Sequence, residues 1–168
     1  MSHRTRTWGT AVVAIILAAA GLLVVGPAQA ARLPGCVASE LHLVRGSSEA
    51  ATGHRYDRFR ITNVGERTCR LYGYPTFRFR NAAGDRIGYA SVPAGVPAHV
   101  VRLAPGDHTR ITVGTVVPGV TVASECRARH AASVDIRLAY RAHVYHRAIS
   151  LQVCTTKKYR PTSYPVGF

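Results

Sequence analysis

Short stretches of alternating apolar and polar residues, separated by turn residues, make up the chain beyond about residue 30. In the clearest stretch, 133–140, alternate positions are apolar: Val134, Ile136, Leu138 and Tyr140. Alternate side chains of an extended strand point to the same face, so this pattern predicts a β-strand with one buried face. No apolar pattern with the 3.6-residue period of a helix continues beyond two turns in this part of the sequence.

A second strand is predicted directly after the first, at 143–153. Its apolar face consists of Tyr145, Ile149, Leu151 and Val153, and it is interrupted by Arg147. A two-residue turn at 141–142 would place Val134 opposite Ile149, so that the apolar faces of both strands coincide. Because this turn contains neither Gly nor Asn, a longer loop is the alternative.

Six further strands are predicted, at 40–45, 56–63, 76–80, 86–90, 99–103 and 109–115. Turn residues cluster between several of them, at 46–48, 63–66, 81–85 and 104–107. Seven or eight short strands in one domain predict an all-β fold, an antiparallel β-sandwich. We expect this single domain to span 31–168, with 155–168 as a tail that forms a sheet edge or is loosely ordered.

Residues 1–30 have the three parts of a secretory signal peptide. A basic start precedes a small and apolar run at 11–25 and a small-residue cleavage signal at 28–30. The pattern predicts a protein that is secreted or held in the cell envelope and does not span the membrane after cleavage. One alternative is a retained anchor, although the run is shorter than the ~20 residues of a span. Another is lipid attachment at Cys36, which would leave an odd number of cysteines to pair.

Export to an oxidising compartment allows the four cysteines of the chain to pair. In the predicted hairpin, Cys154 lies opposite residue 129 and close to Cys126. This register favours a Cys126–Cys154 bridge and leaves Cys36 to pair with Cys69. Because Cys154 has the outward parity of its strand, we expect its bridge at the edge of the sheet and not in the core.

Several of these segments together are similar to one protein family. They are Cys36, Ser39-Glu40-Leu41, Gly53-His54-Arg55-Tyr56, Ile61-Thr62-Asn63, Cys69-Arg70-Leu71-Tyr72-Gly73-Tyr74-Pro75 and Leu103-Ala104-Pro105-Gly106, followed by two later cysteines. From Cys36 to about Cys154 the chain resembles the actinobacterial exported family called domain of unknown function 4232. The most specific part is Cys-x-Leu-x-Gly-Tyr-Pro, and the last hairpin departs from the family by lacking Pro-Pro-Gly. The resemblance implies a secreted or envelope-attached, immunoglobulin-like sandwich and implies no activity.

The chain is strongly basic, with 22 Lys and Arg against 8 Asp and Glu and a formal net charge of +14. Strand parity directs five arginines outward: Arg58, Arg60, Arg78, Arg80 and Arg137. Arginine suits phosphate and carboxylate groups, so these residues are the candidate site for an anionic polymer of the cell envelope. Another exported protein is the other candidate partner. A solvated sheet face in an arginine-rich composition is the alternative, and the lack of interleaved aromatic residues speaks against nucleic acid.

Catalytic, metal and cofactor sites are not expected in this sequence. It contains no Gly-x-Ser-x-Gly, no His-Glu-x-x-His and no phosphate-binding Gly loop. His143 and His146 resemble a chelating pair, but residues three apart on a strand point to opposite faces. Tyr74, between Gly73 and Pro75, is interpreted as a structural residue. We therefore expect a secreted, non-catalytic binding or interaction domain. The alternative is a secreted protease inhibitor that presents an exposed loop at 92–98.

Overall fold

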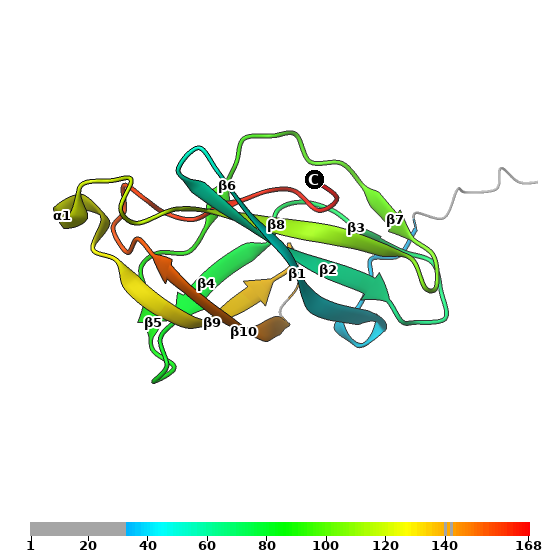
Figure 1. Ribbon diagram of the computed structural model, residues 1–168. Coiled ribbons are helices and arrows are strands. Elements are labelled where there is room, and N and C mark those ends of the chain that lie inside the picture. The colour runs from blue at the N-terminus through cyan, green and yellow to red at the C-terminus, as the bar shows by residue number, and fades with distance from the viewer. Residues whose placement is uncertain (1–32, 140, 142) are drawn as a thin grey trace, which may run out of the picture. The chain divides into compact units, whose positions relative to one another are not determined.

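The strands of the computed structural model form three sheets in the part of the chain that it describes, which is residues 33–139, 141 and 143–168 (Figure 1). The largest sheet has five strands in the order β1-β2-β8-β11-β6, and the second has four in the order β10-β9-β4-β5. A third sheet pairs β3 with β7. The predicted signal peptide at 1–30 lies outside the described residues, as do Tyr140 and Ala142 of the predicted hairpin.

The predicted all-β class is confirmed over this region. The five-stranded sheet consists of β1 (Leu41–Ala51), β2 (His54–Asn63), β8 (His108–Val116), β11 (Thr162–Ser163) and β6 (Val92–Pro93). The four-stranded sheet consists of β10 (Val144–Val153), β9 (Arg129–Arg137), β4 (Thr76–Arg80) and β5 (Arg86–Ile87). The small sheet pairs β3 (Cys69–Leu71) with β7 (Val101–Leu103). Two short helical turns are η1 (Ala38–Glu40) and α1 (Ala123–Cys126), and no helix of the described region is long and apolar enough to cross a membrane.

Side chains from the two larger sheets form one hydrophobic core. Phe59 of β2 and Phe77 of β4 meet in it with their ring centroids 5.9 Å apart, and both are fully buried. Val134 and Ile136 of β9 are also fully buried and belong to the same cluster. Burying one large apolar side chain stabilises a fold by about 1.5–3 kcal/mol, so this shared core holds the two sheets together as layers.

The hairpin of β9 and β10 has the predicted faces, but its predicted register is wrong, and the strands are joined by the longer loop that was the alternative to a two-residue turn. Val134 pairs with Arg147 instead of Ile149, and residues 138–143 connect the strands instead of a two-residue turn. A shift of two residues leaves every side chain on its own face, which is why the predicted apolar face of β10 is still buried. Beyond Ala148 a bulge shifts the pairing once more.

Arg147 interrupts the apolar face of β10 because its guanidinium group reaches the other sheet. Its Nε donates a hydrogen bond of 2.7 Å to the carbonyl oxygen of Leu43 on β1. The guanidinium carbon also lies 5.9 Å from the centroid of the Tyr145 ring. This side chain therefore links the edges of the two sheets, with its charge stacked on an aromatic ring.

The turn predicted at 46–48 is also wrong, since these residues belong to β1. A bulge between Arg45 and Ser48 shifts the pairing of β1 with β2, and small residues are equally suited to a bulge and to a turn. The chain turns later, at Thr52 and Gly53, which have positive φ angles of 50° and 78°. A two-residue turn with positive φ at both positions matches the twist of antiparallel strands.

The C-terminal segment is an inner part of the five-stranded sheet, not a loosely ordered tail or an edge. Strand β11 pairs with β8 on one side and with β6 on the other. Ser163 and Val166 are almost completely buried. The segment predicted as an exposed loop at 92–98 therefore begins with a strand, held by hydrogen bonds of 2.9 Å from Val92 N to Pro161 O and from Ala94 N to Ser163 O.

Both predicted disulfides are present, Cys36–Cys69 and Cys126–Cys154. Cys36 and Cys69 belong to the central hydrophobic cluster and are fully buried. The other bridge joins α1 to the end of the edge strand β10 and is buried outside that cluster, in keeping with the expected position at the sheet edge. Because Cys36 is bonded to Cys69, it has no thiol available for lipid attachment.

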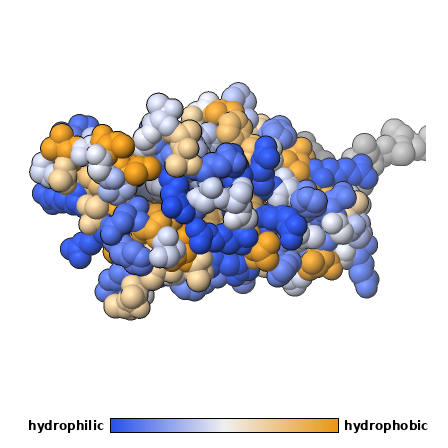
Figure 2. Space-filling view, viewed as in Figure 1, coloured by the Kyte–Doolittle hydropathy of each residue, from blue (hydrophilic) through white to orange (hydrophobic). Residues whose placement is uncertain are grey.

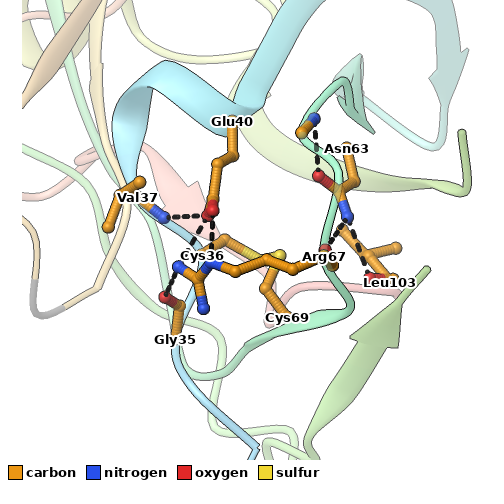
Figure 3. Close-up of polar contacts among 9 residues, drawn as sticks. Gly35, Cys36, Val37, Glu40, Asn63, Arg67, Cys69 and Leu103 are labelled. Atoms are coloured by element: carbon orange, nitrogen blue, oxygen red, sulfur yellow. Dashed lines mark hydrogen bonds and ion pairs between the residues drawn. A yellow bond between two sulfur atoms is a disulfide. The ribbon is translucent and has the colours of Figure 1, made fainter. Parts of the chain in front are cut away.

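A polar network holds the segment before β1 against the connection from β2 to β3 (Figure 3). The carboxylate of Glu40 accepts hydrogen bonds from Val37 N at 2.8 Å and from Arg67, whose Nη2 also donates to the carbonyl oxygen of Gly35. Asn63, fully buried, donates to the carbonyl oxygens of Arg67 and Leu103 at 2.9 and 3.0 Å. These contacts lie around the Cys36–Cys69 disulfide. The disulfide and the hydrogen bonds therefore hold the same segment before β1 in place.

A buried charge lies on the inner side of β2. The carboxylate of Asp57 is only 1% exposed and accepts hydrogen bonds from Arg45 Nη2 at 3.2 Å and from Arg55 Nε at 3.0 Å. Both arginines remain about one third exposed. Asp57 is thus satisfied by two partners whose own charges stay in contact with water.

Candidate functional site

The arginines predicted to point outward lie on two different sheets. Arg78 and Arg80 are on β4, and Arg137 is on the neighbouring strand β9, so these three share the four-stranded sheet. Arg58 and Arg60 are on β2 in the five-stranded sheet. Since the inner faces of these sheets enclose the same core, the arginines make two separate basic faces.

On the four-stranded sheet, the carboxylate of Asp135 lies among the arginines. Asp135 pairs directly with Arg78 in the β4–β9 register, and it accepts hydrogen bonds from Arg80 Nε at 2.7 Å and from His146 Nδ1 at 2.9 Å. Burial opposes ionisation of Asp135, but the hydrogen bonds from His146 and Arg80 outweigh it and lower the pKa of this carboxyl group. Arg78 is exposed beside this network and Arg137 is exposed at its end. Asp135 therefore compensates part of the positive charge of this face within the protein.

On the five-stranded sheet, two arginines stand opposite each other instead. Arg60 of β2 pairs with Arg110 of β8 in the register, and both are exposed. No ion pair of either side chain is found among the described residues, and Arg110 Nε donates to the main-chain oxygen of Phe168 at 2.7 Å. Like charges directly opposite on a sheet repel each other, so this pair raises the positive potential of the face.

Arg58 completes this basic cluster of Arg58, Arg60 and Arg110. Its guanidinium group forms an ion pair with Glu49 on β1. That hydrogen bond is the main reason why the pKa of Glu49 is lowered and the pKa of Arg58 is raised. Glu49 is largely exposed, so the pair is open to exchange with an anion from solution.

Three aromatic rings lie beside the basic cluster on the same face. The centroids of Tyr164 and Phe168 are 4.6 Å apart with the ring planes at 15°, and Tyr56 meets Tyr164 edge-on at 5.9 Å. Gly114 of β8 pairs with Tyr56 and lies beneath these rings. A Cβ atom at this position would lie 3.3 Å from the ring of Tyr56 and 3.4 Å from that of Tyr164. We call Tyr56, Tyr164 and Phe168 the aromatic row.

Two adjoining hollows run along this face. One, of about 410 Å³, is lined by the three arginines of the basic cluster together with the small residues Gly46 and Ser47 of the β1 bulge. The other, of about 560 Å³, is lined by the aromatic row together with Glu49. Arg58, Arg110 and Gly167 line both hollows, which makes them one groove with a charged half and an aromatic half. Clefts of this size are in the range that holds small ligands or a few units of a polymer.

Sequence reasoning found Arg58 and Arg60 of this groove but missed Arg110 and the aromatic row. Arg110 has the same outward parity on β8 as Arg60 on β2, so the signal was present in the strand pattern. The aromatic residues could not be found in that way, because Tyr164 and Phe168 reach Tyr56 only through the long-range pairing of β11. The expectation that no aromatic residues interleave with the arginines is therefore wrong for this face.

The remaining sequence candidates lie away from the groove. His146 is hydrogen-bonded to Asp135, whereas the His143 ring packs edge-on against Tyr145 at 4.6 Å between centroids. Across the described residues, no group of three or more His, Cys, Asp or Glu side chains could hold a metal ion. Tyr74 donates a hydrogen bond from its hydroxyl group to the carbonyl oxygen of Val96, which is a structural contact of the kind expected.

The surface seen in Figure 2 is mostly hydrophilic, with hydrophobic side chains gathered near α1. Val120 and Val122, just before α1, are each 61% exposed. Val120 packs over Gly53, where an added Cβ atom would lie 3.2 Å from the Val120 Cγ2 atom.

Comparisons with known proteins identify a family but supply no activity. No curated protein matches the chain. One solved structure that is similar to it is the crystal structure of a selenomethionine-labelled β-glucosidase from Kluyveromyces marxianus, with 10% sequence identity and a TM-score of 0.35. That match covers 74% of this chain and only 14% of the other. Similarity at this level gives no information about the fold or the function of this protein. The family Domain of unknown function (DUF4232) matches residues 36–161, and because this is most of the chain, the protein belongs to that family.

Proposed function

We propose that this protein is an exported, non-catalytic binding domain with an immunoglobulin-like sandwich fold, and that it holds an anionic polymer of the cell envelope in the groove of the five-stranded sheet. The observation that carries the proposal is that Arg60 and Arg110 lie directly opposite each other and that neither side chain forms an ion pair among the described residues. An anion placed between them removes their mutual repulsion and accepts hydrogen bonds from both guanidinium groups. The predicted signal peptide and the two disulfides support export.

The sequence candidates on the four-stranded sheet are weaker sites for such a polymer. Arg80 is engaged by Asp135, and Arg78 lies directly opposite the same acid. A polymer carboxylate or phosphate would have to displace this internal carboxylate or bind next to it. Arg58, Arg60 and Arg110 therefore form the principal site, and Arg78, Arg80 and Arg137 a secondary one.

Retention on an immobilised polyanion, heparin or teichoic acid, tests this assignment. Replacing Arg60 and Arg110 with Gln should move elution to clearly lower salt, whereas replacing Arg78 and Arg137 with Gln removes the same charge from the other sheet and should move it less. Association should weaken steeply with salt, because the Debye length falls from ~10 Å at 0.1 M to ~3 Å at 1 M. Equal shifts for both double variants would show that only net charge matters and would overturn the site.

The protease-inhibitor alternative gains no support from the fold. The segment at 92–98, which would have to project towards a protease, starts as strand β6 and is tied to β11 and to Tyr74. We therefore retain the binding domain as the single proposed function.

A further inference from the structure

We propose that the polymer recognised by this groove is an acidic polysaccharide, whose sugar rings pack against the aromatic row while its carboxylates pair with the basic cluster. This inference rests on the proposed function and specifies the class of its ligand. It follows from the way in which the two halves of the groove are joined.

The aromatic row is fixed in place by contacts with the basic half. The main-chain oxygen of Phe168 accepts hydrogen bonds from Arg110 Nε at 2.7 Å and from the Thr112 hydroxyl group at 3.3 Å. Gly167 N donates to the carbonyl oxygen of Arg110 at 2.9 Å. The ring of Phe168 is thereby held on Tyr164 while remaining 46% exposed. Rings and guanidinium groups thus keep a defined spacing on one rigid sheet, which favours a ligand that alternates apolar and anionic groups.

An acidic polysaccharide has this alternation. The face of a sugar ring carries C–H bonds, whose slightly positive hydrogens are attracted to the negative face of an aromatic ring. Each uronic acid unit also carries a carboxylate, the group that the planar guanidinium fork of arginine binds in a bidentate manner. A polyanion without rings, such as a polypeptide of glutamate, would use only the charged half of the groove.

Nucleic acid fits the row less well, although it also combines rings with charge. A planar base binds single-stranded sites by stacking on an open aromatic face. Tyr164 and Phe168 lie nearly parallel and cover one face of each other, and Tyr56 contacts Tyr164 edge-on, so the row has no gap between its rings for a base. A base can therefore stack only on the outer face of the row, where a sugar ring also packs, and the comparison of probes below separates the two ligands.

The test compares four probes on the complete protein: polygalacturonate, its fully methyl-esterified form, polyglutamate of matched charge, and single-stranded oligothymidylate. We expect polygalacturonate to bind at least tenfold more tightly than polyglutamate at equal ionic strength, which corresponds to about 1.4 kcal/mol. The esterified form keeps the rings but loses the charge, so its binding should fall below that of polygalacturonate.

Phe168→Ala should remove most of the preference for polygalacturonate over polyglutamate, because it weakens polygalacturonate binding far more than polyglutamate binding. Tyr89→Ala is the matched control, since Tyr89 is also 46% exposed but lies against Arg160, outside the groove. Thermal unfolding of both variants shows whether the fold is retained. If Phe168→Ala unfolds, Gly114→Val replaces it, because side-chain atoms added there displace Tyr56 and Tyr164 from below.

The outcomes separate the two levels of the proposal. Failure to bind any of the anionic probes would overturn the proposed function itself. Equal affinity for polygalacturonate and polyglutamate, with no effect of Phe168→Ala, would leave the anion site in place and overturn the sugar inference. Tighter binding of oligothymidylate than of polygalacturonate, lost in Phe168→Ala, would overturn it in favour of nucleic acid.

Discussion

The two disulfides should contribute unequally to stability although they close loops of similar length. The bridges join cysteines 33 and 28 residues apart. In the chain-entropy model, opening them by double Cys→Ala substitution costs about 3.8 kcal/mol for Cys36–Cys69 and about 3.6 kcal/mol for Cys126–Cys154. Loop length alone therefore predicts a difference of only about 0.1–0.2 kcal/mol in the free energy of unfolding.

Packing enlarges that difference. Cys36 and Cys69 are fully buried in the central hydrophobic cluster, whereas the other two cysteines are buried outside it. Removing two sulfur atoms from a close-packed core leaves cavities that cost about 1 kcal/mol for each group of that size. The Cys36→Ala/Cys69→Ala variant should then lose about 5–6 kcal/mol, which is much of the 5–15 kcal/mol that holds a typical domain together.

Urea unfolding of the wild type and both double variants, followed by tyrosine fluorescence and circular dichroism, measures these values. Both variants should unfold with a larger m value than the wild type, because opening a bridge expands the denatured chain. The reasoning is refuted if Cys126→Ala/Cys154→Ala is destabilised as much as, or more than, the variant of the core bridge.

Three further results are expected from the buried and hydrogen-bonded groups. Asp57→Ala should lower the free energy of unfolding by about 2–3 kcal/mol in urea titrations, less than for a fully buried ion pair because both arginine partners keep contact with water. The pKa of Asp135 is lowered in the folded state by its hydrogen bonds with His146 and Arg80, despite the opposing effect of burial. Its stabilisation should therefore be present above about pH 4 and be lost as the pH falls through the folded value, so Asp135→Asn should flatten the acid limb of stability against pH. Burial, together with the Tyr56 hydroxyl group, raises the pKa of Tyr164, as burial raises that of Tyr145, so Tyr164→Phe should remove one late-titrating tyrosine from an alkaline ultraviolet titration.

Local patterns in the sequence were sufficient to predict which faces of β9 and β10 are buried. Alternation with period two survives a register shift of two residues, which is why the face of β10 was predicted correctly although its pairing with β9 was not. Small residues are ambiguous in the same patterns. Gly46 and its two serine neighbours suit a turn as well as a bulge, and only the pairing of β1 with β2 shows that they form a bulge.

Contacts between distant segments could not be predicted from local patterns. Strand β11 has two residues and lies between prolines at 161 and 165, so its sequence resembles a loop. It becomes a strand because β8 and β6 offer free edges on both sides. The aromatic half of the groove depends on this insertion, and this is why sequence analysis predicted part of the basic cluster but none of the aromatic row.

An arginine-rich composition alone does not account for the difference between the two basic faces. Each face carries several arginines and one neighbouring acid, yet the strand registers place these groups differently. On the four-stranded sheet the register sets Asp135 opposite Arg78, so the acid attracts the arginines around it. On the five-stranded sheet the register sets Arg60 opposite Arg110, and the acid, Glu49, is drawn to Arg58 at one side. In the first arrangement opposite charges attract each other, whereas the second leaves two like charges opposed, and it adjoins a groove lined by aromatic rings.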